Sequence, residues 1–241
     1  MGMSEVRPLV VTGAAGALGA TVVHYLASQR QRVVAIDRPE ASAALAAIAR
    51  EAPGVVAMEV DSTIAETWSP VIERITSDWG PPVGAVLVAG GYRGGNRLYE
   101  GEADATWKAM MQMNLESARV ALQVLLPGMV SRRQGSVVVV ASRAAVRPWE
   151  SAGAAAYAAS KAALVALVQT AAAEVLDEGV RINAVLPSVI DTPANRAAMP
   201  NADRARWVAP ASLCEVIHFL LSPASRDVSG VALPVYGRVG V

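Results

Sequence analysis

The sequence predicts one α/β domain with a doubly wound, mainly parallel sheet of seven strands and helices on both faces. Three observations support this prediction. The chain has 241 residues, 53% of them hydrophobic, which is enough for one large core. Short β-branched apolar runs alternate with longer amphipathic stretches. No Pro/Gly/Ser-rich linker divides the chain, so we treat residues 1–241 as a single domain.

Seven apolar runs are expected to form the strands, with helical patterns between them. In chain order they are Pro8–Thr12, Arg32–Asp37, Val55–Val60, Val83–Ala89, Ser136–Ala141, Arg181–Leu186 and Val231–Val235. Runs such as Val83–Ala89 are apolar on both faces, as suits a parallel strand that helices cover on each side. Right-handed crossovers between such strands build a doubly wound sheet.

The Ala-rich stretch Ala152–Ala173 is predicted to be a helix, because alanine has the highest helix propensity. Its small side chains favour close packing or subunit contact. Two longer irregular segments, Gly90–Asp104 and Pro187–Ala209, follow predicted strand ends. We expect these loops to frame a ligand site.

Charge and cysteine content limit the partners. Lys+Arg and Asp+Glu each count 21, and no segment gathers basic residues into a stripe, so nucleic acid is not expected. The single cysteine, Cys214, cannot form an internal disulfide, and no metal-ligand spacing is present. Glu5 and Arg7 leave no room for a signal peptide, and no uninterrupted apolar run is long enough to span a bilayer. These features predict a cytoplasmic protein with no membrane partner.

A glycine-rich turn follows the first predicted strand and leads into a helical pattern. Its glycines permit a tight turn, a close backbone approach to a pyrophosphate and close helix–strand packing. The residues expected to contact a dinucleotide here are Gly13, Ala15, Gly16, Ala17, Leu18 and Gly19. An ordinary glycine-rich turn is the alternative interpretation.

Asp37 ends the second predicted strand 24 residues after Gly13, where a carboxylate can accept both hydroxyls of an adenosine ribose. It favours NAD(H) over NADP(H), because a 2′-phosphate would meet like charge that Arg38 softens without reversing. A helix cap before Pro39 is the alternative role. Asp61 follows the third strand and is expected to accept a hydrogen bond from the adenine amino group, unless it serves only as a turn residue.

Tyr157 and Lys161 are four residues apart in a predicted helix, so their side chains share one face. A nearby cation favours phenolate and is expected to lower the pKa of Tyr157, which would let the phenol exchange a proton with a substrate oxygen. Lys161 can also hold the nicotinamide ribose. A solvated helix face is the alternative interpretation of such a pair.

Two further side chains point to chemistry. Ser142 follows the fifth strand and is expected at the carboxyl edge of the sheet, where its hydroxyl can orient a carbonyl oxygen. Asn114 is polar within the helical Trp107–Gln123 segment and can hold a water that relays protons to Lys161. A buried amide with a structural role is the competing interpretation of Asn114.

Taken in order, the glycine-rich turn, Asp37, Asn114, Ser142 and the Tyr157/Lys161 pair resemble the short-chain dehydrogenase/reductase family over essentially the whole chain. The resemblance implies a Rossmann-like sheet, a catalytic tetrad of these last four residues, and homodimers or homotetramers built from the helices around Ala105–Val130 and Ala154–Asp177. The further cofactor contacts that it implies are Ala89, Gly90, Gly91, Tyr157, Lys161, Pro187, Val189 and Thr192.

The chain departs from the family pattern at three places: Val88 precedes Ala89-Gly90 where the family has asparagine, Ala17 replaces a common glycine, and Ser188 follows Pro187 where glycine is usual. Residues 89–96 and 186–200 instead look like the dihydropteridine reductase branch, which reduces a quinonoid pterin with NADH.

The function expected from these residues is hydride transfer between a nicotinamide and a carbonyl or secondary alcohol, with Tyr157 as general acid or base. The alternatives are an NADH-dependent quinonoid dihydropteridine reductase and a non-catalytic protein that senses NAD(H). Tyr92, Trp149 and Trp207 are expected near the substrate, the last in a candidate lid over Ala194–Trp207.

Overall fold

The computed structural model describes residues 7–101 and 104–239, and Glu5, which entered the signal-peptide argument, lies outside them. Seven strands form one sheet in the order β3-β2-β1-β4-β5-β6-β7. The strands are β1 (Leu9–Thr12), β2 (Val33–Asp37), β3 (Val55–Glu59), β4 (Gly84–Leu87), β5 (Gly135–Val140), β6 (Val180–Pro187) and β7 (Ala232–Val235). Every neighbouring pair is parallel, so the sheet is entirely rather than mainly parallel. All seven predicted strands are confirmed to within two residues at each end.

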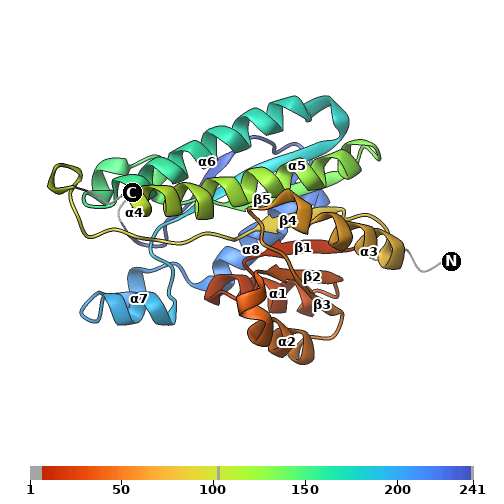
Figure 1. Ribbon diagram of the computed structural model, residues 1–241, viewed down its shortest axis with the longest axis horizontal. Helices are drawn as coiled ribbons and strands as arrows, with labels where there is room; N and C mark the ends of the chain where they lie inside the picture. Colours follow the sequence, from red (N-terminus) through yellow and green to blue (C-terminus); the bar gives the residue numbers. More distant parts are fainter. Residues whose placement is uncertain (1–6, 102–103, 240–241) are drawn as a thin grey trace.

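Helices cover both faces of the sheet and give the molecule three layers (Figure 1). They are α1 (Ala17–Ser28), α2 (Ser42–Glu51), α3 (Ser69–Trp79), α4 (Asp104–Met110), α5 (Ser117–Val130), α6 (Ala155–Glu174), α7 (Pro193–Ala198) and α8 (Pro210–Leu221). One core lies between the sheet and α3, α5 and α6. A second core lies between the opposite face and α1, α2 and α8.

The alternation of side chains between the two faces of each strand explains the two cores. Val10 and Val11 are neighbours in β1, and each is completely buried. Because successive side chains of a strand point to opposite faces, Val10 packs in the first core and Val11 in the second. The apolar runs therefore read as strands that are buried on both sides.

The helix predicted over Trp107–Gln123 is interrupted by a π-helical turn. α4 ends at Met110, residues Met111–Glu116 form the π turn, and α5 continues from Ser117. The Ser117 N–H donates to the carbonyl of Gln112, five residues earlier. Such wide turns are rare and often occur at functional sites.

The predicted Ala-rich helix is confirmed as α6. By length and composition α6 could cross a membrane, which the sequence analysis did not expect, but half of its most apolar window is buried inside the domain. It also carries Lys161, whose side chain is 5% exposed. In this structure α6 is a core helix that packs against β6.

Candidate active site

The predicted site residues gather at the carboxyl edge of the sheet, where strand order reverses between β1 and β4. Crossovers from neighbouring strands diverge there to opposite faces and leave a crevice, the usual ligand site of an open parallel sheet. The turns after β1, β2, β4, β5 and β6 all reach this edge.

The glycine-rich turn needs its glycines for geometric reasons. Gly13 has φ = 66°, and an added Cβ would lie 2.7 Å from the backbone nitrogen of Ala89. At Gly19 an added Cβ would lie 2.0 Å from the Gly13 carbonyl oxygen. Gly16 is the residue before α1, which begins at Ala17. The turn thus brings β1, the loop after β4 and the start of α1 into contact, and the N-terminus of α1 supplies unpaired N–H groups and a positive dipole.

Asp37 ends β2 beside this turn, as predicted. Its Oδ2 accepts a hydrogen bond of 2.9 Å from the Ala15 N–H, and its Oδ1 accepts one of 2.9 Å from the Arg38 N–H. A carboxylate offers about four acceptor positions, so about two remain for the hydroxyls of a ribose. The turn and the carboxylate together fit the pyrophosphate and adenosine ribose of a dinucleotide.

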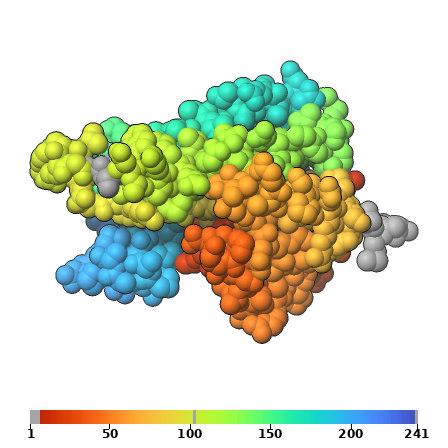
Figure 2. All heavy atoms as spheres, in the orientation of Figure 1, coloured from red at the N-terminus to blue at the C-terminus, as the bar shows by residue number. Residues whose placement is uncertain are grey.

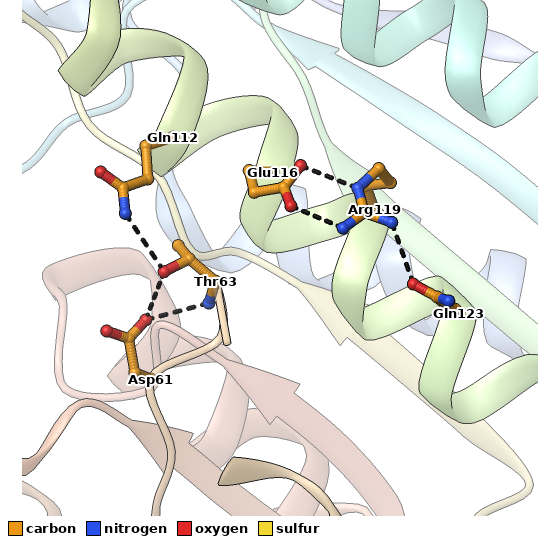
Figure 3. Close-up of polar contacts among 6 residues, drawn as sticks. All are labelled: Asp61, Thr63, Gln112, Glu116, Arg119 and Gln123. Atoms are coloured by element: carbon orange, nitrogen blue, oxygen red, sulfur yellow. Dashed lines mark hydrogen bonds and ion pairs between the residues drawn. The ribbon is translucent and has the colours of Figure 1, made fainter. Parts of the chain in front are cut away.

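Asp61 stabilises its own loop. Its Oδ1 accepts hydrogen bonds from Thr63, at 2.9 Å from the backbone nitrogen and 2.7 Å from the hydroxyl (Figure 3). The Gln112 side chain donates to the same hydroxyl at 3.4 Å and ties this loop to the π turn. Asp61 thus serves as a turn residue, and the adenine contact stays a prediction that would use Oδ2.

Tyr157 and Ser142 meet across the crevice. Ser142 lies beside the Tyr157 side chain, and the Ser142 Oγ accepts the Ala144 N–H at 3.2 Å. Burial raises the pKa of Tyr157; the nearby Ser142 hydroxyl acts in the opposite direction, and Tyr92 adds to the increase. The expectation of a lowered pKa is therefore wrong for this structure, because desolvation of the phenol outweighs the interactions that favour phenolate.

Lys161 lies one turn further along α6, and burial alone lowers its pKa to about 8. Its Nζ donates to the carbonyl oxygen of Val140, at the end of β5, over 3.0 Å. The interpretation as a solvated helix face is excluded by this burial. Because the ammonium is desolvated and has one acceptor within residues 7–101 and 104–239, its remaining N–H groups are available to a ligand in the crevice.

The Asn114 side chain is completely buried and bonded at both ends. Its Oδ1 accepts the Gly91 N–H at 2.9 Å, and its Nδ2 donates to the Ser160 hydroxyl at 3.0 Å. Asn114 therefore joins the loop after β4 to α6, which is the structural role weighed against the relay. The water relay to Lys161 stays a prediction.

Ser160 was missed by the sequence analysis although it lies inside the Tyr157–Lys161 segment. Its hydroxyl accepts from Asn114 and donates to the Tyr157 carbonyl oxygen at 2.8 Å. The signal that could have found it is its position three residues after Tyr157, which places it on the buried side of the helix.

The loop after β4 passes close to these groups. The Ala89 N–H approaches the Thr12 hydroxyl at 3.4 Å. An added Cβ at Gly90 would lie 2.7 Å from Asn114 Oδ1 and 3.4 Å from Lys161 Nζ. A side chain at position 90 would thus displace the Asn114 amide, so glycine is required here for packing.

Of the three aromatic residues expected near the substrate, Tyr92 is in contact with the candidate catalytic group. Its ring meets the Tyr157 ring edge to face, with centroids 5.0 Å apart, and it is 67% exposed. Trp149 is also exposed. Trp207 is 9% exposed and the backbone of Gly237 packs beside it, so its expected substrate contact stays a prediction.

The segment after β6 forms the lobe that contains α7 (Figures 1 and 2). Pro187 ends β6, and the Val189 carbonyl accepts the Val208 N–H at 2.8 Å. The Thr192 hydroxyl caps α7 by accepting the Asn195 N–H at 3.3 Å. Within residues 7–101 and 104–239, no three His, Cys, Asp or Glu side chains come together as metal ligands.

Comparisons with known proteins match this geometry. The family model for short chain dehydrogenases matches residues 7–203. A 3-oxoacyl-(acyl-carrier-protein) reductase of Thermotoga maritima is 29% identical over 97% of both chains. An acetoacetyl-CoA reductase of Synechocystis sp. is 30% identical over 97% of this chain and 96% of its own.

Solved structures agree. The crystal structure of an oxidoreductase of the short chain dehydrogenase/reductase family from Burkholderia thailandensis has a TM-score of 0.83 and 29% identity, over 96% of this chain and 91% of the other. The fold, the family model and the relatives all point the same way: the chain belongs to the short chain dehydrogenase family of oxidoreductases.

Proposed function

We propose that the protein is an NAD(H)-dependent oxidoreductase that interconverts a carbonyl compound and a secondary alcohol, with Tyr157 as the general acid or base. The observation that carries the proposal is the meeting of Tyr157 and Ser142 at the sheet edge, one helical turn from the buried Lys161. When bound, a reduced nicotinamide supplies the hydride, which no amino-acid side chain can do.

The protein groups have separate tasks in the proposed reduction. Ser142 donates a hydrogen bond to the substrate carbonyl oxygen and orients it. Tyr157 gives its phenolic proton to that oxygen as the carbonyl carbon accepts the hydride. The raised pKa keeps Tyr157 protonated at neutral pH, as a general acid must be. In alcohol oxidation the same oxygen of Tyr157 accepts the proton.

Asp37 supports NAD(H) over NADP(H). Its two oxygens are fixed by the N–H groups of Ala15 and Arg38, so the negative charge stays beside the position that a 2′-phosphate would occupy. The relatives named above do not decide this preference. With its single cysteine, Cys214, buried, the chain also suits the cytoplasm, which we propose as its location.

A quinonoid pterin is a second candidate substrate, and the contact of Tyr92 with Tyr157 favours it. The exposed ring of Tyr92 stands beside the phenol that would donate the proton. A flat heterocycle could stack on such a ring while its imine nitrogen receives the proton.

The test is a panel of ketones, acyl thioesters, secondary alcohols and a quinonoid dihydropterin, each assayed with NAD(H) and with NADP(H). We expect turnover of at least one class with a preference for NAD(H). Tyr157→Phe should lower kcat by about 10²–10⁴-fold and leave NADH affinity, measured by fluorescence titration, nearly unchanged. Full activity of this variant would exclude the proton-transfer role, and a preference for NADPH would overturn the role given to Asp37.

A further inference from the structure

A cavity of about 250 Å³ lies between α3 and α5, remote from the crevice described above. Pro81 precedes β4 and Arg132 precedes β5, so the cavity opens at the amino edge of the sheet, opposite the catalytic edge. We name it the α3–α5 cavity. Ile72 of α3 and Val124 of α5 give it apolar walls.

Arg132 is the cationic group in its lining. One terminal nitrogen donates to the Pro82 carbonyl at 2.9 Å, but the Nε–H is buried and finds no acceptor among the described residues. Among the residues that the structure describes, no carboxylate lies within ion-pair distance of the Arg132 guanidinium. The nearby charge that affects it is the positive charge of Arg7. Burial and Arg7 both lower the pKa of Arg132.

A guanidinium in this state lacks an acceptor of negative charge. Buried donors are almost always paired, and a buried N–H without a partner destabilises the fold. Besides Arg132, the polar side chains of the lining are the hydroxyls of Thr76 and Ser131, which carry no negative charge. What would satisfy Arg132 is an anionic oxygen attached to an apolar body.

Gly128 keeps the space beside the guanidinium open. Glycine inside a helix is less favourable than alanine. A Cβ added at Gly128 would meet only Arg132 Nη1, at 3.9 Å, so packing does not require glycine there. The helix therefore forgoes a side chain at the point where the cavity meets Arg132.

We propose that the α3–α5 cavity binds a small organic carboxylate with a short hydrocarbon or aromatic body. The carboxylate accepts from the planar guanidinium fork of Arg132, including the Nε–H, and the apolar body lies against Ile72 and Val124. The volume is below the range of about 300–1,000 Å³ typical of sites for drug-sized ligands, which suits a ligand the size of hexanoate or benzoate. This site is independent of the proposed redox function.

The test compares butyrate, hexanoate and benzoate with butyramide, hexanamide and benzamide, by calorimetric titration of the full chain. We expect saturable binding of at least one carboxylate at one site per chain and none of the matching amide. Arg132→Met should weaken that binding by about tenfold or more, because it removes charged hydrogen bonds. Arg74→Met is the matched control, since Arg74 is exposed on α3 and already paired with Asp78.

Gly128→Leu is the second variant, because it fills the cavity and keeps Arg132. It should abolish binding while the melting temperature stays equal or rises, which separates loss of the site from loss of the fold. Equal binding of acid and amide would overturn the proposal. Unchanged binding in Arg132→Met or in Gly128→Leu would also overturn it. The same holds if none of the three acids shows saturable binding, because the cavity would then contain only water.

Discussion

Lys161 shows how one residue of the site works against the stability of the fold. Its pKa falls from 10.5 to about 8 on burial, so its charged form is disfavoured in the folded protein. A difference of this size corresponds to about 3 kcal/mol. Because the folded pKa is the lower one, this cost is fully present below about pH 8. It disappears as the pH rises from about 8 to 10.5, where the unfolded chain still holds the proton.

Lys161→Met should therefore be more stable than the parent chain at pH 7, by about 2 kcal/mol after about 1 kcal/mol is allowed for the lost hydrogen bond to Val140. The advantage should shrink between pH 8 and 10.5, and turnover should be lost. Urea unfolding of both chains at pH 7 and pH 10 measures the difference. A less stable variant at pH 7, or a gap that does not change with pH, would contradict this account of Lys161.

The position of a single residue in the site was predictable where residue type and spacing in the sequence are enough to place it. Asp37 at a strand end and the Tyr157/Lys161 pair on one helix face follow from position alone. The direction of the Tyr157 pKa shift did not follow, because it depends on how deeply the phenol is buried. The burial of Trp207 and the link from Ser160 to Asn114 also arise from parts of the chain that meet only in the folded molecule.

At the scale of elements, the strands were predictable because β-branched runs apolar on both faces fit a covered parallel sheet. The π turn at Met111–Glu116 was not, because its sequence suits an α-helix equally well. Tertiary bonds fix it instead: Asn114 is held between Gly91 and Ser160, and Gln112 bonds to Thr63.

The glycine-rich turn gives a prediction about an element. Gly19→Ala would put a Cβ within 2.0 Å of the Gly13 carbonyl oxygen, so α1 must move away from the turn. We expect at least about tenfold weaker NADH binding and a fall in stability of about 1–3 kcal/mol from this overpacking.

Gly128→Ala is the matched control, since it makes the same change inside α5 where the nearest atom is 3.9 Å away. It should gain up to about 1 kcal/mol and bind NADH as the parent does. Fluorescence titration and thermal melting measure both variants. Equal effects of the two substitutions would show that the close approach at Gly19 is not what the turn requires.

At the scale of the whole molecule, the parallel sheet separates two regions. Every strand ends at the same edge, so the catalytic groups collect there, and the α3–α5 cavity lies at the other edge. Near the start of α5, Arg119 donates to both Glu116 carboxylate oxygens, at 2.8 and 2.6 Å, and to the Gln123 side chain at 2.9 Å (Figure 3).

We propose that the chain forms a homodimer or homotetramer through α4, α5 and α6. Trp107 of α4 is 45% exposed, and α6 offers small alanine side chains that permit close approach. Sedimentation equilibrium should give two or four times the chain mass, and Trp107→Arg should lower it. Trp149→Arg, at an exposed tryptophan outside these helices, should not. A monomeric parent chain at micromolar concentration would end this proposal.

The π turn also sets the rotation of α4 relative to α5 about their common axis. It holds one residue more than an α-helical turn, so the part before it is rotated relative to a continuous helix. If residues 111–116 took regular α-helical winding without a deletion, α4 would turn by about 100° against α5. Trp107 would then swing around the axis, or Asn114 would leave its partners. The wide turn therefore fixes both the direction in which Trp107 points and the place of Asn114 between Gly91 and Ser160.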